Sequence, residues 1–409
     1  MPDRYFVHTF QNGLTLLAEQ MPGTQSAAMT LLIPAGSAGD PPDASGTATI
    51  VADLILRGAG ARDNRALTEH LDSLGLQRSS GVGVYHTRLG CAAPAARVLD
   101  GLPAYADIVL RPHLPADGFE AARELSLQSL AGLEDEPQRK LMTRLREIYF
   151  PWPLGRNSLG EKHHLQRLTL DRAKDEQKRR FVPEGAIIAF AGHVDFQGVT
   201  DRVDEWFGHW TKAPPVEPAL VQPTTDYQFI EQNSEQTHIG LAWPTIDETH
   251  PDYYVARIAY EVLGGGMSSR LFTEVREKRA LCYSVSAGYG SLKGIGCVMG
   301  YAGTSNERAQ ATLDCYLAEL QRFRGGVTQD ELDRAKIGLK ANTIMSGEST
   351  SARAGAIAHD YFTRGRIRTM EEIKSAIDAV TLDRVNGFLS AAPDKRPTVV
   401  VLGPRELKL

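Results

Sequence analysis

The sequence has few of the features that mark specialised classes of protein. Its 409 residues include only four cysteines, none in a C-x-x-C pair, so we expect reduced thiols and no disulfide framework. The formal net charge of -5 provides no basic surface of the kind that binds nucleic acid. No stretch approaches the roughly 20 apolar residues that a membrane helix needs, and the first residues show no signal-peptide pattern. We therefore expect a cytoplasmic protein with neither nucleic acid nor a membrane as its partner.

The composition is typical of a globular chain with more than one domain. Hydrophobic residues make up 42% and charged residues 23% of the sequence, and its length exceeds what one core usually organises. A proline-rich stretch at 211–228 favours an extended tether, because proline cannot join a helix or strand ladder there. We therefore predict an N-terminal domain over 1–210, a linker over 211–228 and a C-terminal domain over 229–409.

The two halves repeat the same order of patterns. Each begins with alternating apolar residues, continues with an apolar helical stretch and a pair of strand patterns, and then reaches a long helix. The segments "DGFEAARELSLQSL" and "QDELDRAKIGLKANTI" match in position and helical period. Any α+β protein shows some self-similarity, but the shared order favours a duplication. We predict an α+β fold of two homologous domains, each with an antiparallel sheet flanked by helices.

Several strings resemble a known family. They are "AGSAGDPPDASGTA", "PWPLGRNSLGE", "AIIAFAGHVD" and, as the longest, "VLGGGMSSRLFTEVREKRALCYSVSAGYG" at 262–290. In this order they resemble the pitrilysin-type zinc metallopeptidases, the family of the mitochondrial processing peptidase. The resemblance implies that the two homologous domains form half of a clamshell, and that two such halves enclose a peptide-binding chamber.

The resemblance also shows what the chain lacks. The family carries zinc on an H-x-x-E-H helix, where two histidines four residues apart share one face and the glutamate takes a proton from the metal-bound water. The corresponding positions here are Thr49, Ala52 and Asp53, and the later glutamate ligand falls on Ser129. Threonine is a poor zinc ligand, alanine accepts no proton, and the lone Asp53 is expected to be structural or solvated. We predict that this chain holds no metal or other cofactor and is no enzyme on its own.

No other histidines replace the lost motif in the sequence. His163 and His164 are adjacent, so on a helix they should diverge by about 100° and should not share a metal. His70 and His86 have no histidine partner three or four residues away. The sequence therefore predicts no replacement zinc site.

The second half keeps two hydrogen-bond donors of the family. In "VREKRALCY", Arg276 and Tyr283 are seven residues apart, and the resemblance implies that this pair reaches the substrate at a zinc site. A guanidinium and a phenol can both bind a carbonyl and stabilise a developing oxyanion. From spacing alone, a solvated helix face and an ordinary strand aromatic remain alternatives.

A glycine run precedes this pair. Gly264, Gly265 and Gly266 resemble a shortened form of the glycine-rich loop with which partner subunits of the family contact substrate. A helix C-cap with a close approach of two backbones is an equal alternative.

Together these features predict a non-catalytic subunit of a heterodimeric zinc metallopeptidase. A homologous partner would hold the zinc, peptides would be the substrates, and this chain would supply Arg276 and Tyr283 in trans. One alternative is a structural scaffold related to the core proteins of respiratory complexes. Another is an independent hydrolase using Ser129, Thr49 and Asp53, which the absence of a histidine in register argues against.

Overall fold

The computed structural model describes residues 4–393 and 395–409, and the chain divides into two compact units. The first unit contains the chain up to Gly132 together with Trp152–Val221 and Ser346–Ile367. The second contains Leu133–Pro151, Gln222–Met345 and the chain from Arg368 onward. Neither unit is one continuous stretch of sequence.

The first unit is built on a six-stranded sheet. Its strands are β1 (Tyr5–Thr9), β2 (Thr15–Gln20), β3 (Ser26–Ile33), β6 (Gln77–Val82), β7 (Thr87–Pro94) and β8 (Ile187–Gly192), and β4 (Gly58–Ala59) and β5 (Arg62–Asp63) form a small separate ladder. Its helices are α1 (Thr47–Leu54), α2 (Asn64–Ser73), α3 (Ala95–Val98), α4 (Leu102–Leu110), α5 (Ala116–Gly132), α7 (Lys162–Arg167), α8 (Leu170–Arg180), α9 (Phe196–Phe207) and α13 (Thr350–Arg364).

The second unit is built on a five-stranded sheet. Its strands are β9 (Tyr227–Glu231), β10 (Gln236–Thr245), β11 (Ser284–Leu292), β12 (Ile295–Ser305) and β13 (Thr398–Gly403). Its helices are α6 (Pro137–Tyr149), α10 (Tyr253–Gly264), α11 (Ala309–Phe323), α12 (Gln329–Gly347, whose last two residues fall in the first unit), α14 (Met370–Asp378) and α15 (Leu382–Ser390), with a π-helix at Phe272–Glu277.

The two sheets have the same topology. The first has the order β1-β2-β8-β3-β7-β6, and the second, taken from its other edge, has the order β9-β13-β10-β12-β11. Strand by strand the second sheet repeats the first without β1, and the corresponding pairs run in the same relative directions. The predicted α+β class is confirmed, and the shared topology supports the predicted duplication.

Neither sheet is purely antiparallel, which corrects one detail of the prediction. β2 and β8 run parallel in the first sheet, and β9 and β13 run parallel in the second. In both cases the later strand enters the sheet after a long connection of helices, which allows a parallel pairing that a short hairpin cannot make. Local strand patterns carry no information about that pairing.

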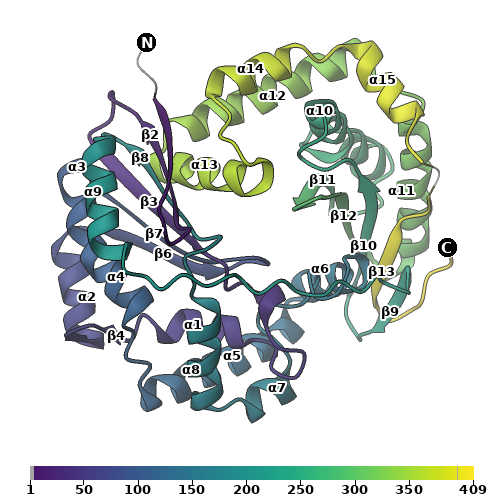
Figure 1. Ribbon diagram of the computed structural model, residues 1–409. Coiled ribbons are helices and arrows are strands. Elements are labelled where there is room, and N and C mark those ends of the chain that lie inside the picture. The colour runs from purple at the N-terminus through teal and green to yellow at the C-terminus, as the bar shows by residue number, and fades with distance from the viewer. Residues whose placement is uncertain (1–3, 394) are drawn as a thin grey trace. The chain divides into compact units, whose positions relative to one another are not determined.

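Both sheets are covered on both faces, because their central strands alternate between two apolar layers. In β8, Ile188 and Phe190 pack into the layer that contains α1, α4 and α9, whereas Ile187 and Ala189 pack against α13 (Figure 1). In β13 of the second unit, Val399 and Val401 face the layer of α10 and α11, and Val400 and Leu402 face α6.

The covering helices α6 and α13 come from unexpected parts of the sequence. α6 follows α5 of the first unit along the chain but packs Leu141, Leu145 and Ile148 onto the second sheet. α13 follows α12 of the second unit but packs Ile357 and Ala358 onto the first sheet. The two corresponding helices are therefore exchanged between the units.

The predicted linker is irregular over most of its length. Residues 211–226 form no helix or strand apart from an isolated bridge between Val221 and Trp152, and β9 begins at Tyr227. The chain passes from the first unit to the second at Val221 and Gln222, within the proline-rich stretch. Among the described residues, no helix combines the length and the apolar character needed to cross a membrane.

A buried ion pair fixes α13 to the first sheet and gives a test of this exchange. Arg353 of α13 donates from Nε to Oε2 of Glu19 in β2 at 2.8 Å, and both side chains are almost fully buried. We expect Arg353→Met to lower the free energy of unfolding by about 3–5 kcal/mol, because Glu19 would keep a buried charge without its partner. Urea unfolding measures this.

The control is Arg65→Met, which removes an arginine from the exposed pair Arg65–Glu69 and should change stability by less than about 0.5 kcal/mol. The double variant Arg353→Met/Glu19→Met should recover part of the loss. Equal, small effects of Arg353→Met and Arg65→Met would contradict the anchoring role of the buried pair.

Candidate functional site

The helix that corresponds to the family's metal helix is α1, and its start is held by a buried carboxylate. Asp40 accepts hydrogen bonds from the backbone N–H groups of Gly46 at 2.8 Å and Ala48 at 2.9 Å. It also pairs with Arg180 of α8 at 3.0 Å, and both side chains are essentially inaccessible to solvent. The carboxylate therefore satisfies two of the free amide groups that every helix start presents.

A close approach of two glycines also fixes the start of α1. Gly46 has a φ of +90° and Gly160 has a φ of +82°, which only glycine adopts readily. A Cβ atom at Gly160 would lie 2.3 Å from the carbonyl oxygen of Ser45, and a Cβ at Gly46 would lie 2.6 Å from that of Leu159. The strings "SGTA" and "SLGE" are thus in contact, and this contact explains why both contain glycine.

Two of the four positions predicted to correspond to the family's metal site are bound to other groups of the chain. The Thr49 hydroxyl donates to the carbonyl oxygen of Ser158 at 2.5 Å. The Asp53 carboxylate accepts from Nε of Arg57, which follows the end of α1, at 2.6 Å. Arg57 thus places a positive charge beside the one carboxylate that could have bound a cation, so Asp53 has a structural partner.

The remaining two positions add no ligand. Ala52 is buried and offers only a methyl group, and Ser129 of α5 is half-buried with a hydroxyl in place of a carboxylate. Zinc sites take thiolate, imidazole or carboxylate ligands, and a catalytic site needs three of them with a proton acceptor nearby. Thr49, Ala52, Asp53 and Ser129 do not fit a catalytic zinc ion.

The expected divergence of the His163 and His164 side chains is wrong. Their rings do not diverge, because the ring centroids are 3.9 Å apart with an angle of 48° between the planes. Glu161 joins them, with its Oε2 3.6 Å from Nδ1 of His163. The side chains lie at the first turn of the short helix α7, where their rotamers compensate for the angular separation of the Cα atoms. Sequence spacing on an ideal helix misses such a group.

Arg276 lies in the second unit on an unusual helical turn. The π-helix Phe272–Glu277 contains it, and the Lys278 N–H donates to the carbonyl oxygen of Thr273, five residues earlier. The guanidinium lies 4.7 Å from the centroid of the Phe272 ring and is exposed. π-helical turns are rare and often occur at functional sites.

Tyr283 follows after a strained residue. Ala280 has a φ of +50°, a left-handed conformation that costs energy for a residue with a side chain. The Tyr283 N–H then donates to the carbonyl oxygen of Gly303 at the start of the β11–β12 ladder, and Tyr283 is 64% exposed. Neither the Arg276 guanidinium nor the Tyr283 hydroxyl has an ion-pair or hydrogen-bond partner among the described residues. Both donors are therefore available to a ligand.

Cys282, between these residues, is not a candidate nucleophile. Its side chain is buried, and burial raises the pKa of its thiol to about 11 although Arg276 opposes the shift. The thiol is therefore protonated at neutral pH.

The glycine run combines a structural position with an open one. Gly264 ends α10 and Gly265 is its C-cap residue. A Cβ at Gly264 would lie 2.2 Å from the backbone nitrogen of Ala287 in β11, whereas a Cβ at Gly266 would meet nothing within 4 Å. Gly264 thus allows a close approach of two backbones, and Gly266 leaves space for another molecule.

Arg270 fixes the far end of this run. It donates two hydrogen bonds to the carboxylate of Glu331 in α12, at 2.6 and 2.7 Å. Burial raises the pKa of Glu331, but the hydrogen bonds from Arg270 and Thr328 outweigh burial and lower it to about 2. Glu331 is therefore ionised at neutral pH, and the pair holds the loop end against α12.

Comparison with known proteins places this architecture in a family. Residues 15–161 match the model described as insulinase (peptidase family M16), and residues 167–339 match the one described as the peptidase M16 inactive domain. The chain belongs to peptidase family M16.

Relatives that match this chain over almost their whole length, and a solved structure, are similar to it in sequence and in fold. An uncharacterized zinc protease of Mycobacterium tuberculosis is 27% identical over 413 residues, covering 98% of this chain and 93% of that protein. One of Bacillus subtilis is 28% identical over 392 residues, covering 93% of this chain and 94% of that protein. The fold is similar to that of a peptidase M16 inactive domain from Pseudomonas fluorescens, with a TM-score of 0.90, 22% identity and full coverage of both chains.

The two glycines give a prediction that separates the structural position from the open one. Gly264→Ala should lower the free energy of unfolding by about 1–3 kcal/mol, because the new methyl group would overlap the backbone of β11. Gly266→Ala should leave stability unchanged or slightly raised, since the methyl group has room. Thermal and urea unfolding of the two variants measure the difference, and equal stabilities would contradict this packing.

Proposed function

We propose that this chain is the non-catalytic subunit of a heterodimeric zinc metallopeptidase. The observation that carries the proposal is the contrast between the two sets of family positions. Thr49 and Asp53 are bound to groups of the chain itself, and Ala52 cannot act as a base. The hydrogen-bond donors of Arg276 and Tyr283, in contrast, have no hydrogen-bond or ion-pair partner among the described residues. A homologous partner subunit would hold the zinc and its general base.

Arg276 and Tyr283 would act on the substrate at the partner's site. During peptide hydrolysis, negative charge develops on the oxygen of the scissile carbonyl. A guanidinium and a phenol can donate hydrogen bonds to that oxygen or to a neighbouring substrate carbonyl. The strained Ala280 between them fixes the direction in which the chain leaves the π-helix and enters β11, so the two donors are presented from ordered backbone.

A peptide substrate also fits the sheet edges. Among the described strands, β6 lies at the edge of its sheet beside β7, and most of its residues are exposed. An extended peptide can pair with such an edge through its backbone, which gives affinity with little demand on sequence. This mode suits an enzyme that acts on unstructured segments.

The test is reconstitution with a homologous chain that carries the intact H-x-x-E-H motif. An unstructured fluorogenic peptide should not be cleaved by this chain alone and should be cleaved by the mixture, with activity lost on chelation and restored by zinc. Chelator-sensitive cleavage by this chain alone would contradict the proposal. A complex that forms without any gain in cleavage would favour the scaffold alternative.

The two donors provide the sharper prediction. In the reconstituted complex, Arg276→Ala and Tyr283→Phe should each lower kcat by about 10²-fold, the loss typical when one donor to an oxyanion is removed. Size-exclusion chromatography should show the complex intact, because both side chains are exposed and unpaired within the described chain.

Arg65→Ala is the matched control, since it removes an exposed arginine of α2. It should leave kcat unchanged. If Arg276→Ala and Tyr283→Phe also leave kcat unchanged, these residues have no role in trans.

A further inference from the structure

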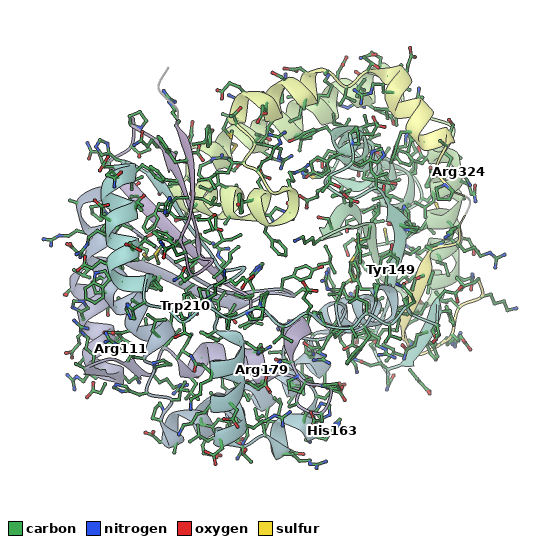
Figure 2. All side chains as sticks on the ribbon, viewed as in Figure 1. Arg111, Tyr149, His163, Arg179, Trp210 and Arg324 are labelled. Carbon is green, nitrogen blue, oxygen red and sulfur yellow. The ribbon has the colours of Figure 1, made fainter. Side chains whose placement is uncertain are left out.

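A cluster of potential metal ligands lies outside the former zinc motif. The ligand atoms of Glu161, His163 and His164 all lie within 4.8 Å of one another. Within the described residues this is the one group of three or more histidine, cysteine, aspartate or glutamate side chains that comes together in this way. His163, labelled in Figure 2, and Glu161 are 62% and 64% exposed at the side chain, so an ion can reach them from solvent.

A buried hydroxyl orients this cluster. The Oγ atom of Ser45 lies 2.8 Å from Nδ1 of His164 and accepts a hydrogen bond from the backbone N–H of Glu161 at 3.1 Å. Ser45 itself is almost fully buried. In the tautomer whose Nδ1–H donates to Ser45, the Nε2 lone pair of His164 is free to bind a metal. Such a second hydrogen bond is the usual way in which proteins orient a ligating imidazole.

The ligand types and distances select a class of ion. Two imidazoles and one carboxylate suit Zn²⁺ and the related divalent ions of cobalt, nickel and copper. Ligand atoms bound to one zinc ion at about 2.1 Å are roughly 3.4 Å apart in a tetrahedron. The ligand atoms lie within 4.8 Å of one another, so a bound ion would draw them closer through rotation of the exposed Glu161 and His163 side chains, and a fourth position would remain for water.

We propose that Glu161, His163 and His164 form a binding site for a divalent transition-metal ion, separate from the degenerate motif on α1. The site is coupled to that helix through Ser45, the residue directly before the N-cap Gly46. A bound ion would fix the His164 ring in the orientation that contacts Ser45 at the start of α1, and would thereby stabilise the first unit. This inference does not depend on the proposed subunit function.

Metal titration of the full chain, without a polyhistidine tag and freed of metal by chelation and dialysis, tests the site. Isothermal titration with Zn²⁺ should show one ion bound per chain in the micromolar range, and Co²⁺ should give the visible absorption of a nitrogen- and oxygen-ligated ion. Saturating Zn²⁺ should also raise the melting temperature of the wild-type chain.

Variants identify the ligands. His163→Ala and His164→Ala should each weaken Zn²⁺ binding by at least about tenfold and abolish the rise in melting temperature, and Glu161→Gln should also weaken binding. His193→Ala removes another exposed histidine and serves as the control with unchanged affinity. Because His163 is exposed, its variant remains informative if His164→Ala perturbs folding. Absence of stoichiometric binding, or equal affinity in the wild type and His163→Ala, would overturn the proposal.

Discussion

The structure of the first unit depends on the buried pair of Asp40 and Arg180. Asp40 binds the first amide groups of α1, and Arg180 donates to the carbonyl oxygen of Gly36 as well as pairing with Asp40. Removing either partner would leave a buried charge without its opposite charge at 3.0 Å, at a cost of about 3–5 kcal/mol. The position of α1 is thus set by a carboxylate outside the helix and by contact of Gly46 with the loop at Gly160. No ligand on α1 is needed for that position, so the helix keeps its place although its metal-binding residues are absent.

The exchange of α6 and α13 makes the duplication more than a tandem repeat. Each sheet has one apolar face covered by helices of its own half of the sequence and the other covered by a helix from the opposite half. Because a sheet with one uncovered apolar face is unstable in water, neither half of the sequence contains everything that its own sheet requires. The folding of the two units is therefore linked through the connectivity of the chain, and the ion pair between Arg353 and Glu19 is one of the contacts that stabilise the exchanged arrangement.

Much of this architecture follows from local sequence patterns, and the exceptions have physical reasons. The apolar strand patterns of β10 and β12, the amphipathic period of α11 and the prolines before Tyr227 all identify their elements, because these patterns are local in the sequence. The parallel strand pairs and the helix exchange depend on contacts between residues far apart in the chain, which periodicity does not encode. The π-helix at Arg276 depends on a local deviation from ideal helix geometry, and the close approach of the His163 and His164 rings depends on their rotamers. The poor fit of Thr49, Ala52 and Asp53 to a catalytic zinc ion follows from residue type alone, whereas the cluster of Glu161, His163 and His164 depends on rotamers that the sequence does not give.

Whether a polar side chain has a partner within the fold distinguishes structural residues from those available for function. A polar group with a structural role finds a partner within the fold, as Thr49 finds the carbonyl of Ser158 and Asp53 finds Arg57. Arg276 and Tyr283 are exposed, and their donors have no partner within the described chain, although the backbone around them adopts a π-helix and a left-handed alanine that both cost energy. Folding stability does not explain a strained segment that presents two unpaired donors. The proposed contact of both donors with a substrate would account for it, whereas a purely structural scaffold has no need of the two donors.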